Sequence, residues 1–329
     1  MKTFFQSAFM KVFFAIVLFF GAMFGLNSWD TIKKYDAKVE KLTFMENTME
    51  TAIPQTSVYT TIKNHFESPL AEGKTVKKAI LIGYDGCRLD ALTLIDDNHP
   101  SAIRRVREQG HALIAYAGGA NYPEYNVQKT KTAPGWCTEL TGEWANVHGV
   151  KDNLQVKKSG VNTLMTAGVE SGLFDDSAMY VSWRNHFTSN LSTYKQEKAY
   201  TEEKGLPVTW LYAEDDDGTR ANVLADLNRE DCTDFIFLTL EYTDHCGHST
   251  GFNVESKKYQ TAFYNAEAAA DEFLDAIEAR PNYDTEDWLI IMATDHGGYD
   301  TFHGASTKQE RMIWIVCNKD IVASENTHG

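Results

Sequence analysis

Short apolar runs alternate with amphipathic stretches along the chain from residue 77 onward. The stretches at residues 101–109, 220–228 and 257–279 place apolar side chains at helical spacing or carry helix-forming residues, and we predict them to be helices. The apolar runs are uniformly hydrophobic, as expected for strands covered on both faces. Six runs are predicted strands: Ala79–Tyr84, Ala112–Tyr116, Met179–Trp183, Phe235–Leu240, Trp288–Ala293 and Met312–Cys317. The alternation predicts an α/β fold, with a mostly parallel central sheet flanked by helices on both faces.

Three parts of the chain depart from this alternation. Residues 1–26 contain the uncharged run Val12–Leu26, which fits a signal peptide better than a full bilayer span; an uncleaved membrane anchor is the alternative. Either interpretation places the main domain outside the cytoplasm, secreted, periplasmic or membrane-anchored. Residues 27–74 mix charges with short apolar stretches and are predicted to be a helical spacer. Within the main domain, residues 75–329, the segment 151–218 shows few clean periods and is interpreted as insertions and a lid.

Composition narrows the range of partners. The 329 residues are 43% hydrophobic and carry a net charge of −15, which is ordinary for a globular protein but unsuited to nucleic-acid polymers. The acidic charge favours a small substrate, or a local positive site that is made by metal ions and not by Lys and Arg. The five cysteines include no C-x-x-C pair, which argues against a thiolate zinc site, and their odd number leaves at least one without an intrachain partner.

Acidic and histidine side chains follow three of the predicted strands. Asp85 comes after the first strand, Asp244 and His248 follow the fourth, and Asp295 and His296 follow the fifth, with His303 seven residues later. Ligands of open parallel sheets bind beyond the carboxyl ends of the strands, so these side chains are expected at one edge. Carboxylate and imidazole together form the donor set that zinc prefers. For any single pair, a salt bridge or helix cap is the alternative.

A second signal is the segment from Lys131 to Gly142. Thr132 is predicted as the N-cap of a helix with Pro134 in its first turn, and Gly142 suits the helix C-terminus. The free N–H groups of a helix N-terminus could stabilise both an alkoxide and an incoming phosphate. Taken alone, Thr132 is more often a plain cap than a nucleophile.

The ordered set of motifs resembles the alkaline phosphatase superfamily, in particular its type I phosphodiesterase/nucleotide pyrophosphatase-like branch. The pieces run from about Lys77 to Cys317: Tyr84-Asp85-Gly86, Thr132-Ala133-Pro134, Leu140-Thr141-Gly142, His148-Gly149, Asp244-x-x-Gly247-His248, Asp295-His296-Gly297 and His303-Gly304. Relatives usually continue with another helix beyond Cys317, so the sequence is expected to be a shortened one.

The resemblance implies a two-metal phosphoric ester hydrolase with a phospho-threonine intermediate, two divalent metal ions, preferably Zn²⁺, and a small phosphate-ester substrate. Thr132 resembles the nucleophile, and His148 a structural residue that holds a turn. The implied ligands of one ion are Asp85, Thr132, Asp295 and His296, and those of the other are Asp244, His248 and His303.

One departure concerns the phosphate. Relatives commonly have an Asn after the Pro, which helps to bind a phosphate oxygen, whereas this chain has Gly135 followed by Trp136. The Gly135 N–H and the Lys131 side chain are the candidate replacements. The residues at positions 132 and 136 also argue against a sulfatase. A sulfatase needs Cys or Ser at the first of these positions and Arg at the second, whereas this chain has Thr132 and Trp136. A phosphomonoesterase of the same superfamily and a non-catalytic metal-binding or interaction protein with the same fold remain the alternatives.

Overall fold

The computed structural model describes residues 31–329, and these fall into two compact units that are divided after Leu42. In the first unit, residues 31–39 are helical. The expected leader, residues 1–26, lies outside the described residues. Among residues 31–329, no helix is long and apolar enough to cross a bilayer.

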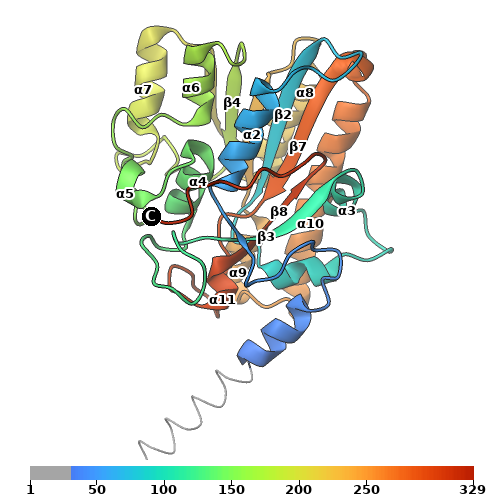
Figure 1. Cartoon of the computed structure of the whole chain (residues 1–329), viewed down its shortest axis with the longest axis vertical. Helices are drawn as coiled ribbons and strands as arrows, with labels where there is room; N and C mark the ends of the chain where they lie inside the picture. The colour runs from blue at the N-terminus through green and yellow to red at the C-terminus, as the bar shows by residue number, and fades with distance from the viewer. Residues whose placement is uncertain (1–30) are drawn as a thin grey trace, which may run out of the picture. The chain divides into compact units, whose positions relative to one another are not determined.

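An eight-stranded sheet forms the centre of the second unit (Figure 1). Its order is β1-β3-β8-β7-β2-β6-β4-β5, and every pairing is parallel except the two made by β8. All six predicted strands are present, and the α/β, mostly parallel architecture is confirmed. The strands are β1 (Ile53–Pro54), β2 (Val76–Tyr84), β3 (His111–Tyr116), β4 (Ser177–Val181), β5 (Val208–Tyr212), β6 (Phe235–Leu240), β7 (Glu286–Ala293) and β8 (Met312–Cys317).

Helices cover both faces of the sheet. In Figure 1, α2 lies in front of the strands and α8 and α10 lie behind them. The helices are α2 (Ser57–Glu67), α3 (Ala102–Arg107), α4 (Thr132–Thr141), α5 (Ala145–His148), α6 (Leu164–Ser171), α7 (Lys195–Lys204), α8 (Asp216–Leu227), α9 (Tyr242–Thr250), α10 (Lys257–Glu278) and α11 (Lys308–Arg311), with short 3₁₀ turns η1 (Leu89–Leu94) and η2 (Tyr283–Thr285). The three predicted helices correspond to α3, α8 and α10.

The sheet contains two strands, β1 and β5, that the apolar runs do not predict. Residues 43–74, expected to belong to a spacer, are part of the second unit: β1 pairs with β3, and α2 packs on β2, β7 and α4. Residues 151–218, interpreted as insertions and a lid, contain β4 and β5, which extend the other side of the sheet. Two-residue β1 is too short to give a periodic signal, and the half-exposed edge strand β5 lacks the uniform burial of the central strands.

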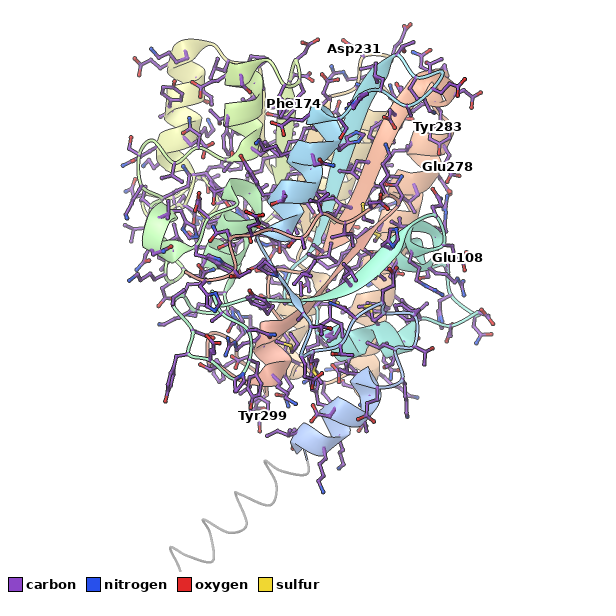
Figure 2. The ribbon with its side chains drawn as sticks, in the orientation of Figure 1. Glu108, Phe174, Asp231, Glu278, Tyr283 and Tyr299 are labelled. Carbon is purple, nitrogen blue, oxygen red and sulfur yellow. The ribbon has the colours of Figure 1, made fainter. Side chains whose placement is uncertain are left out.

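The core lies between the sheet and the helices. Near the amino ends of the strands, Phe174 packs 4.7 Å from Phe66 and 5.7 Å from Phe235 between ring centroids. Figure 2 labels Phe174 at this end and Tyr299, in the loop after β7, at the opposite end. All five cysteines lie in the described part of the chain, and all are free thiols.

Three adjacent strands, β7, β2 and β6, determine where the functional side chains lie. Their register pairs Gly83 with Ala293 and Tyr84 with Leu240, so the three strands end at the same level. The N–H of Asp85 still donates to the Leu240 carbonyl (3.0 Å). The residues that follow these strands therefore meet at one edge, as expected for the carboxyl ends of a parallel sheet.

Candidate active site

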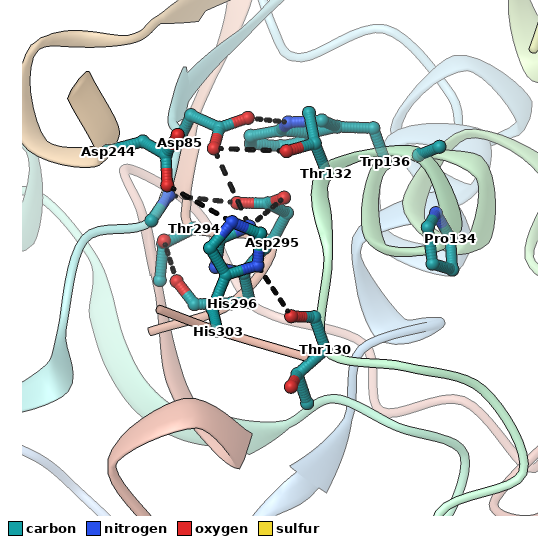
Figure 3. A network of polar contacts seen from close by, with 12 residues as sticks. Asp85, Thr130, Thr132, Pro134, Trp136, Asp244, Thr294, Asp295, His296 and His303 are labelled. Carbon is teal, nitrogen blue, oxygen red and sulfur yellow. Dashed lines mark hydrogen bonds and ion pairs between the residues drawn. The ribbon is translucent and has the colours of Figure 1, made fainter. Parts of the chain in front are cut away.

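The candidate acidic and histidine side chains converge at this edge (Figure 3). His296 Nε2 lies 3.6 Å from Asp85 Oδ1 and 3.4 Å from Asp295 Oδ2. Asp244, on the first turn of α9, lies 3.5 Å from the Nε2 atoms of both His248 and His303. The spacing of Asp244 and His248 is one turn of α9, so one helix presents both side chains to the cluster.

Asp85 is fixed by several buried contacts. Its Oδ2 accepts a hydrogen bond from the indole N–H of Trp136 (2.9 Å), and its Oδ1 accepts one from the Thr132 hydroxyl (3.4 Å). Asp295 Oδ1 accepts the N–H of Gly86 (3.2 Å), which links the ends of β2 and β7. The carboxylate orientations are therefore set by neighbouring backbone and by α4.

Backbone carbonyls fix the tautomers of the three imidazoles. The Nδ1 atoms of His248, His296 and His303 lie 3.0, 2.7 and 3.0 Å from the carbonyl oxygens of Thr301, Gly297 and Thr130. A carbonyl oxygen can only accept, so each Nδ1 carries a proton and each Nε2 is the ring atom that faces the carboxylates. This second-sphere arrangement is the one that metal-ligating histidines adopt.

The unsatisfied atoms of the cluster fit divalent cations. Asp244 Oδ1, Asp295 Oδ2 and His296 Nε2 are buried without a hydrogen-bond partner. The Nε2 atoms of His248 and His303 lie 3.0 Å apart, a distance at which they share either a proton or a common cation. Three groups of donors are close enough to hold an ion: Asp244, His296 and His303; Asp85, Asp295 and His296; and Asp85, Glu241 and Asp244.

Burial raises the pKa values of the carboxyl groups and lowers those of two imidazoles, and a cation would reverse only the first of these shifts. Burial, and then the neighbouring Asp244 carboxylate, raises the pKa of Asp85; burial, and then Asp85, raises that of Asp295; burial raises that of Asp244 to about 7. Burial lowers the pKa of His296, and it lowers that of His303 to about 4. The imidazoles are thus neutral and able to ligate, whereas the crowded carboxylates need positive charge nearby to stay ionised.

Thr132 begins α4, but it is the first helical residue and not the N-cap, which is Lys131. Fewer N–H groups are free at this helix end than the sequence predicted. The N–H of Ala133 donates to Asn153 Oδ1 (2.9 Å), and Pro134 has none. The predicted C-terminus at Gly142 is correct, since Gly142 adopts the left-handed conformation (φ 69°).

The Gly135 N–H, one of the two candidate phosphate donors, donates to the Lys131 carbonyl (2.9 Å). Glycine is required there for another reason: a Cβ would lie 2.7 Å from Asp295 Cβ and 2.9 Å from Asp295 O. Position 135 therefore allows α4 to approach the end of β7. The side chain of Lys131, the second candidate donor, ion-pairs with Asp152 (2.7 Å).

Two residues of the site, Glu241 and Gln55, were not among the predicted ones. Glu241 is buried and immediately follows β6, as Asp85 follows β2, so its position after a strand could have revealed it. Gln55 donates through Nε2 to Glu139 Oε1 and to the Asp295 carbonyl, both at 2.8 Å, and no sequence signal marks it. His148, expected to be structural, is buried and bonded to Thr138 and to the Val150 N–H.

This fold, with acidic and histidine side chains clustered after adjacent parallel strands, is that of the alkaline phosphatase superfamily. Residues 79–313 match the family described as type I phosphodiesterase/nucleotide pyrophosphatase, and the chain belongs to that family. No curated protein sequence matches the chain.

Three solved structures are similar to the chain in fold. A putative sulfatase from Bacteroides thetaiotaomicron has a TM-score of 0.51 at 12% identity, covering 76% of this chain and 66% of that one. Murine ectonucleotide pyrophosphatase/phosphodiesterase 5 has a TM-score of 0.47 at 17% identity, covering 67% and 57%. Alkaline phosphatase from the Antarctic bacterium TAB5 has a TM-score of 0.45 at 14% identity, covering 74% and 91%. The chain thus spans 57% of the length of the murine protein.

Proposed function

We propose that the chain is a metal-dependent phosphodiesterase that uses Thr132 as its nucleophile and passes through a phospho-threonine intermediate. The observation that carries this proposal is the convergence of three imidazole Nε2 atoms with the carboxylates of Asp85, Asp244 and Asp295 beside a buried threonine hydroxyl. Three atoms of this set, Asp244 Oδ1, Asp295 Oδ2 and His296 Nε2, have no hydrogen-bond partner, and carboxylates with imidazoles suit divalent ions, preferably zinc.

Two ions fit the donors better than one. Asp85, Asp295 and His296, with the Thr132 oxygen, form the first proposed set; Asp244, His248 and His303 form the second. Two divalent cations balance three carboxylates and one alkoxide, so an anionic ester can enter a chain whose net charge is −15. When bound, the ions supply the positive charge that favours the Thr132 alkoxide and the departing oxygen.

The chain's own residues orient the reaction. Thr132 Oγ1, 3.4 Å from Asp85 Oδ1, attacks phosphorus; the phosphorus–leaving-group bond breaks and the leaving alcohol departs. Water then cleaves the phospho-threonine, which releases the phosphate monoester and restores the hydroxyl. Trp136 holds Asp85, and the carbonyls of Gly297, Thr130 and Thr301 hold the imidazoles, so the geometry is set before substrate binds.

The test compares metal-replete wild type with Thr132→Ala on a chromogenic phosphodiester and on the matching monoester, with and without chelator. We expect diester turnover to exceed monoester turnover, chelator to abolish both, and Thr132→Ala to lower turnover by on the order of 10⁴-fold while it keeps its metal. Thr141→Ala is the matched control, because Thr141 lies on the same helix and its hydroxyl donates to the Cys137 carbonyl.

Metal content provides an independent readout of the ligand assignment. His248→Ala and Asp295→Ala should each lower the stoichiometry measured by elemental analysis, whereas Thr141→Ala should not. Full metal content in both ligand variants would refute the assignment. A wild type that binds metal but hydrolyses neither ester would instead indicate a binding protein, and faster monoester hydrolysis would indicate a phosphomonoesterase.

A further inference from the structure

Glu310, on the short helix α11, is buried beside the loop that carries His303. Its Oε1 accepts the N–H of Ala305 (2.8 Å), and its Oε2 accepts both the N–H (3.1 Å) and the hydroxyl (2.7 Å) of Thr307. A carboxylate can accept from all three donors, whereas an amide in its place would present one acceptor oxygen and N–H donors of its own. The Glu310 carboxylate therefore fixes the main chain just after His303.

The main chain of Glu310 contacts the loop that carries His296. Its carbonyl accepts the N–H of Gly297 (3.0 Å), and the Gly297 carbonyl accepts the Nδ1–H of His296 (2.7 Å). The two segments approach closely, because a Cβ at Gly297 would overlap the carbonyl oxygen of Gln309. Glu310 is thus bonded to the segments of both His296 and His303, whose rings stack with their centroids 3.9 Å apart.

Thr130 also holds the His303 segment. Its carbonyl accepts the Nδ1–H of His303 (Figure 3), and its hydroxyl accepts the N–H of Gly304 (3.2 Å) and donates to the carbonyl of Ala305 (3.0 Å). Glu310 binds the N–H of the same Ala305, so this residue is held at both of its peptide groups. Thr130 sets the tautomer of the His303 ring, and Glu310 fixes the main chain that follows it.

We propose that Glu310 is a positioning residue that sets the separation between the two proposed metal sets. The inference rests on the proposed function, in which His296 belongs to the first set and His303 to the second. The Glu310 carbonyl holds the first histidine through Gly297, and the Glu310 carboxylate holds the second through Ala305. Removing the carboxylate releases the His303 segment from α11 but leaves the His296 segment attached. The second set then loses its geometry, and the first set keeps it.

The test measures zinc binding to Glu310→Gln by competition with a chromophoric chelator. Loss of a group that supports a metal ligand lowers affinity about 10- to 100-fold, and we expect the lower end because Glu310 acts on the main chain and not on the ring. The affinity for one bound ion should fall about tenfold, and that for the other should change by less than about twofold. For the chromogenic diester, kcat should fall with little change in KM, because the second set acts on the departing oxygen.

Glu197→Gln is the matched control. Glu197, on α7, is also buried, and its carboxylate accepts the N–H (2.8 Å) and the hydroxyl (2.7 Å) of Thr163, as Glu310 accepts those of Thr307. Glu197 also pairs with Lys157 (3.1 Å), so its replacement removes a buried ion pair as well. This variant should lose stability but keep both zinc affinities.

The His303→Ala background shows whether Glu310 acts through His303. The second set already lacks its histidine there, so adding Glu310→Gln should change neither the number of bound ions nor their affinities by more than about twofold. If Glu310→Gln does not fold, Thr307→Val takes its place, since it removes only the hydroxyl that donates to Glu310. That variant should weaken binding of the same ion about threefold.

Unchanged zinc affinities in Glu310→Gln would overturn the inference. The same loss in Glu197→Gln, or a further loss in the His303→Ala background, would also overturn it. A wild type that binds two ions but hydrolyses no ester would refute the proposed function, and the zinc titrations would still decide the role of Glu310. Ester turnover with equal zinc binding in wild type and Glu310→Gln would refute this inference alone, and a wild type that binds only one ion would refute both.

Discussion

The indole N–H of Trp136 supports Asp85, and Trp136→Phe isolates that contact. The variant keeps an aromatic ring in the core but removes the 2.9 Å hydrogen bond to Asp85 Oδ2. A hydrogen bond to a charged group contributes about 1.5–3 kcal/mol. The hydrogen bond stabilises Asp85 when this carboxylate is ionised and binds metal, so its loss should lower metal affinity about 10- to 100-fold.

Trp144→Phe is the matched control for this substitution. Trp144 is equally buried, and its indole N–H also makes one 2.9 Å hydrogen bond, to the Asn326 carbonyl. Both variants lose one buried bond and part of a large ring, so each metal-free protein should lose about 1–3 kcal/mol of unfolding free energy. Only Trp136→Phe should weaken metal binding.

Two measurements separate these effects: competition of each protein with a chromophoric chelator for zinc, and denaturant unfolding of the chelated proteins. The reasoning is refuted if Trp136→Phe binds zinc as tightly as wild type. It is equally refuted if Trp144→Phe loses the same affinity, because the loss would then follow stability and not the support of Asp85.

Two further predictions concern close packing and protonation. Gly135→Ala should lower metal content and turnover, because its Cβ would lie 2.7 Å from Asp295 Cβ. Gly168→Ala, whose Cβ would clash with Phe174 in the core, is the control and should reduce thermal stability but leave the metal stoichiometry intact. Full metal content in Gly135→Ala would contradict the prediction. Burial lowers the pKa of His65 to about 4, whereas a histidine in the unfolded chain has a pKa of roughly 6.5. The unfolded state therefore binds protons preferentially, and the free energy of unfolding should fall as pH drops from about 6.5 towards 4. Between pH 7 and 5, His65→Gln should lose about 2 kcal/mol less unfolding free energy than wild type, and identical losses in denaturant titrations would exclude this role.

The sequence predicts the central strands and the acidic side chains that follow them, because both depend on local pattern. Uniformly apolar runs identify buried parallel strands, and the carboxyl ends of such strands converge whatever the loops do. Asp85, Asp244 and Asp295 could therefore be placed together. The N-cap assignment of Thr132 differs by one residue, because a boundary depends on backbone geometry that cap preferences do not fix.

Features that depend on tertiary contacts could not be predicted. Gln55 reaches Glu139 and Asp295 only because β1 pairs with β3 at the side of the sheet. The Gly135 N–H is not free, because it forms a hydrogen bond to the Lys131 carbonyl at the start of the helix. A Thr-x-Pro pattern does not determine whether this bond forms. The expectation of a spacer up to residue 74 had a similar cause, since α2 is recognisable as core only once its partners are known.

The bond from Gln55 to the Asp295 carbonyl joins residues 240 positions apart. During synthesis, the Gln55 side chain cannot form this hydrogen bond until Asp295, 240 residues later in the chain, has been added. This edge of the sheet is therefore among the last parts of the protein that can be completed. A protein that began at residue 75, at the apparent start of the alternating pattern, would lack Gln55 and with it one support of the Asp295 backbone.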